Sequence, residues 1–258
     1  MNILLTNDDG IDSQGILKPA EVLRSKGKYN VFVLAPDSDR SGVSHSFSIL
    51  YKPLKLTEIS KDNWKFTGLP VDCVIAAVMG GVPCKPDVII SGINRGANIG
   101  SDLHYSGTAA AARQGAMMGI PSIAVSLDAK ENFYWEMAAG YLADHFEEFI
   151  SMWEENIFLN VNIPNNKNGP DGMVNTWPVR TNYNDTMSIF RGPGNRDWCY
   201  LKPGVESTVE EKGTDRDAVS RNLVSVSPVY VHPVVHRGLC PDAPDNAAIS
   251  ASCCGKRS

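Results

Sequence analysis

Short apolar runs alternate with amphipathic segments through the first two thirds of the chain. The apolar runs end in turn-forming residues, which is typical of buried strands in a parallel sheet. They predict strands at 3–5, 30–35, 86–91, 121–126 and 157–163. Helical periodicity predicts helices at 16–25, 71–79, 105–118 and 133–153. Ser13 is a candidate N-cap of the first helix, which is expected to begin late so that Pro19 falls within its first turn. Strands that alternate with helices predict an α/β fold with three layers, in which helices cover both faces of a Rossmann-like sheet.

Two regions depart from this alternation. Residues 43–67 carry short alternating runs at 44–50, 54–58 and 64–67, which predict an inserted β-hairpin excursion. Residues 165–213 are dense in Asn, Gly and Pro, with a short strand expected at 174–181, and predict a β-rich lid or subunit contact. A brief helix capped at Thr214-Asp215 and running through Val219 is expected to follow, and then a strand at 223–227.

Composition and charge narrow the classes of function. The formal net charge of the 258 residues is -5, which argues against binding of a nucleic-acid duplex but leaves room for a mononucleotide. No apolar run reaches the roughly 18 residues that span a membrane, and no signal-peptide pattern opens the chain. No membrane partner is therefore expected. The six cysteines include no C-x-x-C pair, so a reduced cytoplasmic protein is expected.

Polar side chains follow three of the predicted strands at the point where each strand ends. Asp8 and Asp9 follow the first strand, Arg40 and Ser41 follow the second, and a glycine-rich segment at 92–100 follows the third. Carboxyl ends of parallel strands meet at one edge of a sheet, so these groups are expected to share one crevice. A solvated Asn-Asp-Asp-Gly turn and a solvated arginine loop are the alternatives for the first two segments.

A phosphate site is predicted beside this crevice. Ser106, Gly107 and Thr108 open an alanine-rich helix, where backbone N–H groups, hydroxyls and the positive end of the helix dipole favour an anion. Asn98, in the preceding glycine-rich segment, can donate an N–H group to the same anion. Ordinary helix capping is the alternative, because most Ser and Thr caps bind no ligand.

The candidate ligands for a metal are oxygen atoms. The two carboxylates of Asp8 and Asp9 with a hydroxyl and the amide oxygen of Asn94 suit one divalent ion such as Mg²⁺ or Mn²⁺, and less so Zn²⁺. A cation beside an anion pocket favours phosphoryl chemistry. The hypothesis is that metal-activated water attacks phosphorus, with Asp8 or Asp9 orienting it.

Several motifs in the same order resemble the SurE family of metal-dependent nucleotidases. They are L-L-T-N-D-D-G-I at 4–11, A-P-D-S-D-R-S-G at 35–42, G-L-P-V-D-C-V at 68–74, I-I-S-G-I-N-R-G-A-N-I-G at 89–100, Y-S-G-T-A-A-A-A at 105–112, V-N-I-P at 161–164 and T-D-R-D-A-V-S at 214–220. The resemblance implies hydrolysis of 5′- and 3′-nucleoside monophosphates, and some members of the family also cleave short polyphosphate.

Carried over by position, the resemblance assigns roles to single residues. The metal ligands would be Asp8, Asp9, Ser41 and Asn94, and the phosphate contacts Asn98, Ser106, Gly107 and Thr108. It also implies homodimers or tetramers built by a C-terminal extension. The expected division is a catalytic core at 1–164, a β-rich excursion with an oligomerisation segment at 165–228, and a mobile tail at 229–258.

Two other classes of protein compete with this interpretation. Receiver-type signalling domains also place paired acids after their first strand, but they need an acceptor Asp after the third strand and a Lys after the last. A nucleotide-binding module without catalysis is the second competitor. An aspartyl-nucleophile phosphatase would use D-x-D, a spacing that Asp8 and Asp9 do not give.

Overall fold

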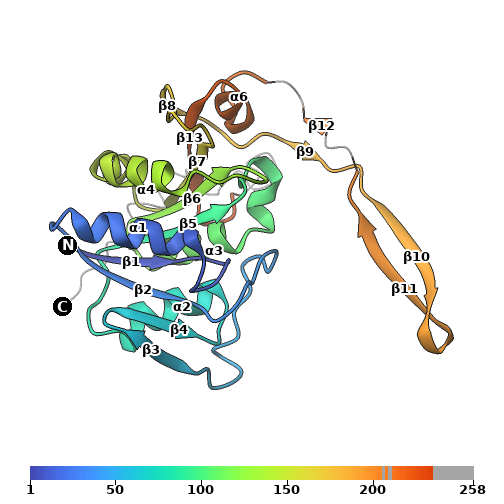
Figure 1. The fold of residues 1–258 in the computed structure, drawn as a ribbon, viewed down its shortest axis with the longest axis horizontal. Coiled ribbons are helices and arrows are strands. Elements are labelled where there is room, and N and C mark those ends of the chain that lie inside the picture. Colours follow the sequence, from blue (N-terminus) through green and yellow to red (C-terminus); the bar gives the residue numbers. More distant parts are fainter. Residues whose placement is uncertain (205–206, 209–210, 235–258) are drawn as a thin grey trace, which may run out of the picture.

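The computed structural model describes residues 1–204, 207–208 and 211–234. A nine-stranded sheet forms its centre, in the order β3-β4-β2-β1-β5-β6-β7-β13-β8 (Figure 1). The strands are β1 (Asn2–Thr6), β2 (Asn30–Pro36), β3 (Leu56–Ser60), β4 (Asn63–Phe66), β5 (Val88–Arg95), β6 (Ser122–Asp128), β7 (Ile157–Pro164), β8 (Gly172–Asn175) and β13 (Leu223–Tyr230). The run from β4 to β7 is parallel, while β3 and β13 are antiparallel to their neighbours β4 and β7.

Helices cover both faces of this sheet. They are α1 (Gln14–Ser25), α2 (Pro70–Ala76), α3 (Gly107–Met117), α4 (Trp135–Asp144), α5 (Phe146–Met152) and α6 (Asp215–Ser220). Residues of α1, α4 and α5 share one apolar core, and α2 contributes to a second core that α3 also enters. The predicted three-layer α/β fold is confirmed.

The strand β1 explains why a purely apolar run forms the middle of the sheet. Ile3 and Leu5 belong to one core, and Leu4, between them, belongs to the other. Successive side chains of a strand point to opposite faces, so a strand covered on both faces must be apolar at every position.

Three predicted elements differ from the structure. The first helix was expected to begin late so that Pro19 would fall in its first turn, but α1 begins at Gln14 under the predicted Ser13 cap, with Pro19 inside it. The single helix expected at 133–153 is two helices that meet at His145. No strand forms at 44–50, where two backbone N–H groups, those of Ser48 and Ile49, donate to the Asp72 carboxylate instead of to a sheet neighbour.

The residues after β7 are divided between the central sheet and a projecting arm. β8 and β13 extend the sheet, and β13 runs to Tyr230, beyond the predicted end at 227. The strand expected at 174–181 is instead the end of β8 and a separate short strand, β9 (Thr181–Asn182), which pairs with β12 (Ser207–Thr208). An antiparallel hairpin of β10 (Thr186–Gly192) and β11 (Arg196–Lys202) projects away from the body (Figure 1).

The remaining expectations concern the helix after this arm, the tail and membranes. α6 begins under the predicted Thr214 cap. Most of the tail expected at 229–258 lies outside the described residues, which end at 234. None of the helices in the described ranges is long and apolar enough to cross a membrane.

Candidate active site

The candidate site lies at the carboxyl end of the central strand β1. β1 has β2 on one side and β5 on the other, so the strand order reverses there and opens a crevice at the carboxyl ends. Asp8 and Asp9 stand two and three residues beyond the end of β1. The loop after β2 is held against them, because the N–H of Arg40 donates to the carbonyl oxygen of Asp8 at 2.7 Å. The predicted convergence of the first two segments is confirmed.

Asp8 binds to the beginning of α3. The N–H of Thr108 donates to Oδ2 of Asp8 at 3.1 Å, and the Thr108 hydroxyl donates to Oδ1. Thr108 is fully buried and Asp8 is 3% exposed, so this pairing is shielded from water. The helix N-terminus that was predicted to bind phosphate therefore binds a carboxylate of the protein itself in this structure.

Burial sets the protonation of Asp8. Desolvation raises the pKa of this carboxyl to about 6, with the neighbouring charge of Asp9 adding to the rise. The hydrogen bonds from Thr108 act in the opposite direction because they stabilise the ionised form. A carboxylate that the fold keeps buried at this cost is expected to serve a charged ligand.

Asp9 is held from the other side of the crevice, by the end of β5. Its Oδ2 accepts the N–H of Arg95 at 3.1 Å, and the Arg95 guanidinium Nε lies 4.0 Å from Oδ1. Burial raises the pKa of Asp9, while the contacts with Arg95 lower it and the charge of Asp39 raises it further. β1 and β5 thus bring the first and third predicted segments together.

Two further candidate ligands are oriented locally. Nδ2 of Asn94 donates to the carbonyl oxygen of Gly96 at 2.8 Å, so the amide oxygen is the atom of this side chain left to coordinate a cation. The Ser41 hydroxyl donates to Oδ1 of Asp39 at 2.7 Å, and its N–H reaches the same oxygen at 2.7 Å. Ser41 is exposed, and its direct partner is Asp39 rather than either site carboxylate.

The first turn of α3 packs closely on Asp8. Ser106 caps the helix, since its Oγ accepts the N–H of Ala109 at 3.0 Å. A Cβ atom at Gly107 would lie 2.9 Å from both Cβ and Oδ2 of Asp8. Only glycine leaves room for the carboxylate here, which gives the Ser-Gly-Thr sequence a steric reason.

Asn98, in the loop after β5, is hydrogen-bonded to buried polar side chains of the strands β6 and β7. Its N–H donates to Oδ1 of Asn162 and its carbonyl oxygen accepts from Nδ2 of Asn160, both at 2.9 Å. One N–H of its side chain donates to Oγ of Ser126 at 2.9 Å. The residue expected to contact phosphate is therefore fixed in place, with at least one side-chain donor already used.

Sequence reasoning missed the partners of these residues. Asn160 and Asn162 are fully buried on β7, and the N-V-N pattern inside an otherwise apolar strand was the signal, because buried amides need partners. The pairing of Thr108 with Asp8 left no signal in the sequence, since the two residues are 100 positions apart.

The donor set fits a hard divalent cation. Two neighbouring carboxylates with raised pKa values repel each other less when a cation lies between them. Asn94, which offers a neutral amide oxygen, directly precedes Arg95, whose N–H binds Asp9. The part of the chain that the structure describes contains no group of three or more His, Cys, Asp and Glu residues placed to hold a metal. A metal here would therefore take two carboxylates and neutral oxygens, as the sequence predicted.

Comparison with known proteins decides the family. The family model described as survival protein SurE matches residues 3–185. The chain belongs to the SurE family. A protein of Geobacter sulfurreducens named 5′-nucleotidase SurE is 37% identical over 234 residues, which cover 90% of this chain and 88% of that protein. A protein of the same name from Caldanaerobacter subterraneus subsp. tengcongensis is 34% identical over 234 residues, 89% of this chain and 91% of its own length.

The fold agrees with that of a solved member of the family. The crystal structure of the SurE protein from Aquifex aeolicus superposes with a TM-score of 0.81 at 34% identity, covering 93% of this chain and 98% of that one. SurE membership implies a divalent metal cofactor, and both named relatives are phosphoric monoester hydrolases by name. The competing identification as a receiver-type signalling domain is therefore wrong.

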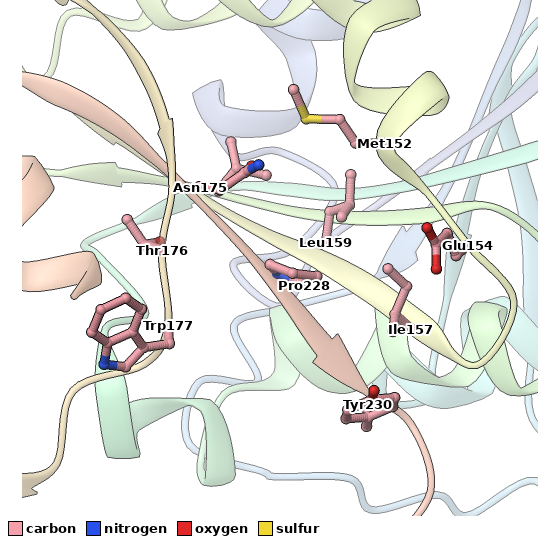
Figure 2. A pocket seen from close by; sticks show the side chains of 10 residues that line it. Met152, Glu154, Ile157, Leu159, Asn175, Thr176, Trp177, Pro228 and Tyr230 are labelled. Carbon is pink, nitrogen blue, oxygen red and sulfur yellow. The ribbon is translucent and has the colours of Figure 1, made fainter. Parts of the chain in front are cut away.

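A cavity of about 610 Å³ lies far from this chemistry, at the opposite edge of the sheet. Its walls come from the start of β7, the end of β13, the end of β8 and the end of α5, with Met152, Trp177 and Tyr230 among the side chains around it (Figure 2). Strand polarity places these ends away from the carboxyl ends of β1 and β5. None of the candidate site residues lines this cavity.

Proposed function

We propose that this protein hydrolyses nucleoside 5′-monophosphates, with one divalent cation held by Asp8 and Asp9. The observation that carries the proposal is the burial of two adjacent carboxylates at the switch point of the sheet, each with a raised pKa. The names of the relatives, 5′-nucleotidase SurE, support the substrate class. Mg²⁺ and Mn²⁺ are the proposed ions, because the donors are hard oxygen atoms.

The ligand set extends the two carboxylates by Ser41 and Asn94. Asn94 is supported by the orientation of its amide, whose nitrogen is already bonded to Gly96. Ser41 is supported by its place in the loop that Arg40 fastens to Asp8. Its hydroxyl would have to turn from Asp39 toward the cation.

The phosphate is assigned to the start of α3 and to Asn98. The N–H groups of Thr108 and Ala109 donate to Asp8 and Ser106, so the N–H of Gly107 is the donor of the first turn that the proposal gives to phosphate. Thr108 holds Asp8 at the same time. Ser106 fixes the direction of the turn, and Asn98 offers its second side-chain N–H.

Each residue then has a task in the reaction. The bound cation supplies positive charge that lowers the pKa of water and neutralises the phosphate. Thr108 and the N–H of Arg95 hold the two carboxylates ionised and in fixed orientation. A carboxylate oxygen of Asp8 or Asp9 would orient the attacking water. The water oxygen forms a new bond to phosphorus as the bond between phosphorus and the ester oxygen breaks. Water loses a proton, and the nucleoside leaves as the alcohol after gaining one.

One assay tests the function. Phosphate release is measured from a panel of nucleoside 5′- and 3′-monophosphates and short polyphosphate with Mg²⁺, Mn²⁺, Zn²⁺ or a chelator. Release from 5′-monophosphates with Mg²⁺ or Mn²⁺, abolished by the chelator, is the expected result. Metal-dependent nucleotide binding with no release would leave a binding module and overturn the proposal.

The proposal includes a homodimer or tetramer and a cytoplasmic location. The projecting β10–β11 arm carries exposed apolar side chains, including Met187, Ile189 and Phe190, which supports a subunit contact in residues 165–228 (Figure 1). The three cysteines of the described ranges are unbridged, which fits a reducing compartment. Light scattering of the purified protein tests the oligomer, and a monomer at micromolar concentration would refute it.

A further inference from the structure

A second cavity, of about 470 Å³, begins directly beside the candidate metal site. Gly96 forms part of its wall and follows Arg95, whose N–H donates to the Asp9 carboxylate at 3.1 Å. Adding the lengths of an N–Cα bond and of one Cα–Cα step places the Cα of Gly96 no more than about 8.5 Å from that carboxylate. One wall of the cavity therefore lies close enough to Asp9 to be reached by a group esterified to a phosphate bound there.

Four segments that are distant in sequence build this cavity. Its walls come from the loop after β5, the loop after β6, the base of the β10–β11 arm at Gly204, and α6. The first two are joined because the N–H of Gly96 donates to the carbonyl oxygen of Leu127 at 3.1 Å. α6 is fixed to the same place because Oδ2 of Asp215 accepts the N–H of Gly100 at 2.7 Å. The T-D-R-D-A-V-S motif, which had no assigned role, thus delivers Arg216 to the cavity.

The lining has the character of a site for an uncharged polar group. Its charged members are two carboxylates and two cations, Asp102, Asp128, Lys130 and Arg216, whose formal charges sum to zero. Lys130 and Arg216 act on Asp128, lowering its pKa against the larger effect of burial, which raises it. The cations are thus compensated by a carboxylate, which disfavours a second phosphate. None of the described lining residues is aromatic, which disfavours a stacked base.

We propose that this cavity receives the sugar of the nucleotide, with Asp128 accepting hydrogen bonds from the 2′- and 3′-hydroxyls of ribose. The inference rests on the proposed nucleotidase function and names which part of the substrate lies beyond the phosphate. A carboxylate accepts and cannot donate when ionised, so it matches a diol whose O–H groups donate. Lys130 and Arg216 are assigned an electrostatic role, because their charges act on Asp128 and favour its ionised form.

The test compares three esters that share a phosphate and differ in the sugar. They are AMP, 2′,3′-dideoxy-AMP and phenyl phosphate, each assayed with saturating Mg²⁺ or Mn²⁺. The wild-type protein is expected to prefer AMP to the dideoxy compound by about ten- to a hundredfold in kcat/KM, the range for hydrogen bonds to a charged group. Asp128→Ala is expected to remove this preference by losing activity on AMP alone, with phenyl phosphate unchanged. Asp128→Asn keeps an acceptor oxygen and is expected to retain part of it.

A matched control variant and the possible results make the test decisive. Glu131→Ala removes an exposed carboxylate three residues away and should leave all three rates unchanged. A wild-type kcat/KM ratio near one between AMP and the dideoxy compound would overturn the sugar site and leave the proposed hydrolysis intact. An equal loss of activity on all three esters in both Asp128 variants would do the same. Gain of tripolyphosphate cleavage in Asp128→Ala with no change on AMP would make the cavity an anion subsite. Absence of release from every ester would instead overturn the proposed function, and this inference with it.

Discussion

Thr108 gives both its backbone N–H and its hydroxyl to the two carboxylate oxygens of Asp8, across 100 residues of sequence. The contact joins the end of the central strand β1 to the first turn of α3. It orients one carboxylate of the candidate metal site and favours its ionised form. The positive end of the helix dipole acts in the same direction.

Replacing Thr108 by valine tests this relationship. Thr108→Val keeps the side-chain shape but removes the hydroxyl donor, so the pKa of Asp8 should rise further and the apparent affinity for Mg²⁺ or Mn²⁺ should fall about tenfold, the value of one charged hydrogen bond. Thr108→Ser restores the donor and should recover most of the affinity. Metal titrations of nucleotidase activity measure the effect, and equal affinity in the valine and serine variants would contradict it.

Asp8→Asn should separate stability from activity. Burying the ionised Asp8 costs the metal-free protein about 3 kcal/mol at pH 7, from a pKa of about 6 against the ordinary value of 3.8. The neutral amide avoids this cost, so the metal-free variant should resist urea better than the wild type while losing metal-dependent hydrolysis. Asp12→Asn, at an exposed position in the same loop, should change neither. A variant that is both less stable and less active would show that Asp8 is needed for folding.

The same shift predicts how pH changes the stability of the metal-free protein. A carboxyl whose folded pKa is raised binds its proton more readily in the folded state, so its contribution favours folding as pH falls. For Asp8 the gain should begin near pH 6 and be complete below the ordinary pKa of 3.8 that the carboxyl has in the unfolded chain. Other groups titrate in this range, so the measured quantity is the difference between wild type and Asp8→Asn in urea midpoints from pH 4 to 7.5. Saturating Mg²⁺ should remove the difference in slope, because the cation keeps Asp8 ionised.

Gly107→Ala tests whether the packing of α3 on Asp8 matters. The added Cβ would lie 2.9 Å from Oδ2 of Asp8, so the carboxylate or the helix must shift, and the rate should fall by at least tenfold. Gly140→Ala is the matched control, because its Cβ meets nothing within 4 Å inside α4 and should add up to about 1 kcal/mol of stability. Assays and thermal melts of both variants give the comparison. Unchanged turnover in Gly107→Ala would remove the steric argument.

Whether a feature of the fold or of the site could be predicted from the sequence depends on how far apart in the chain the interacting residues lie. Local signals succeeded: Ser13 and Thr214 cap helices as expected, because a cap bonds within three residues of itself. The apolar runs gave the parallel strands, and strand polarity then brought Asp8, Asp9 and Asn94 to one edge of the sheet. This convergence needed no knowledge of side-chain contacts.

Long-range competition explains what the sequence did not predict. In the first turn of α3 the N–H of Thr108 donates to the carboxylate of Asp8, which lies 100 residues away in sequence, so no local pattern predicts this contact. A strand was expected at 44–50, but the fully buried Asp72 accepts four hydrogen bonds from Ser48 and Ile49 at 2.8–3.1 Å and fixes a loop there. Pro19 lies inside α1 because the buried face of that helix extends on both sides of it, from Ile16 to Leu23. Packing outweighed local preference in each case.

Asp215 is the anchor through which α6 reaches the site, and its removal should be costly. The side chain is fully buried and accepts the N–H groups of Gly100, Val179 and Arg216 at 2.7–3.0 Å. Asp215→Ala leaves these donors without the carboxylate and should lower the free energy of unfolding by about 2–4 kcal/mol. Asp171→Ala, at an exposed position, should cost less than about 0.5 kcal/mol. Because α6 carries Arg216 into the cavity beside Asp9, the Asp215 variant should also lose preference for AMP over 2′,3′-dideoxy-AMP at temperatures where it remains folded. Loss of stability with that preference intact would mean that α6 is held in place by its packing on β13 rather than by this carboxylate.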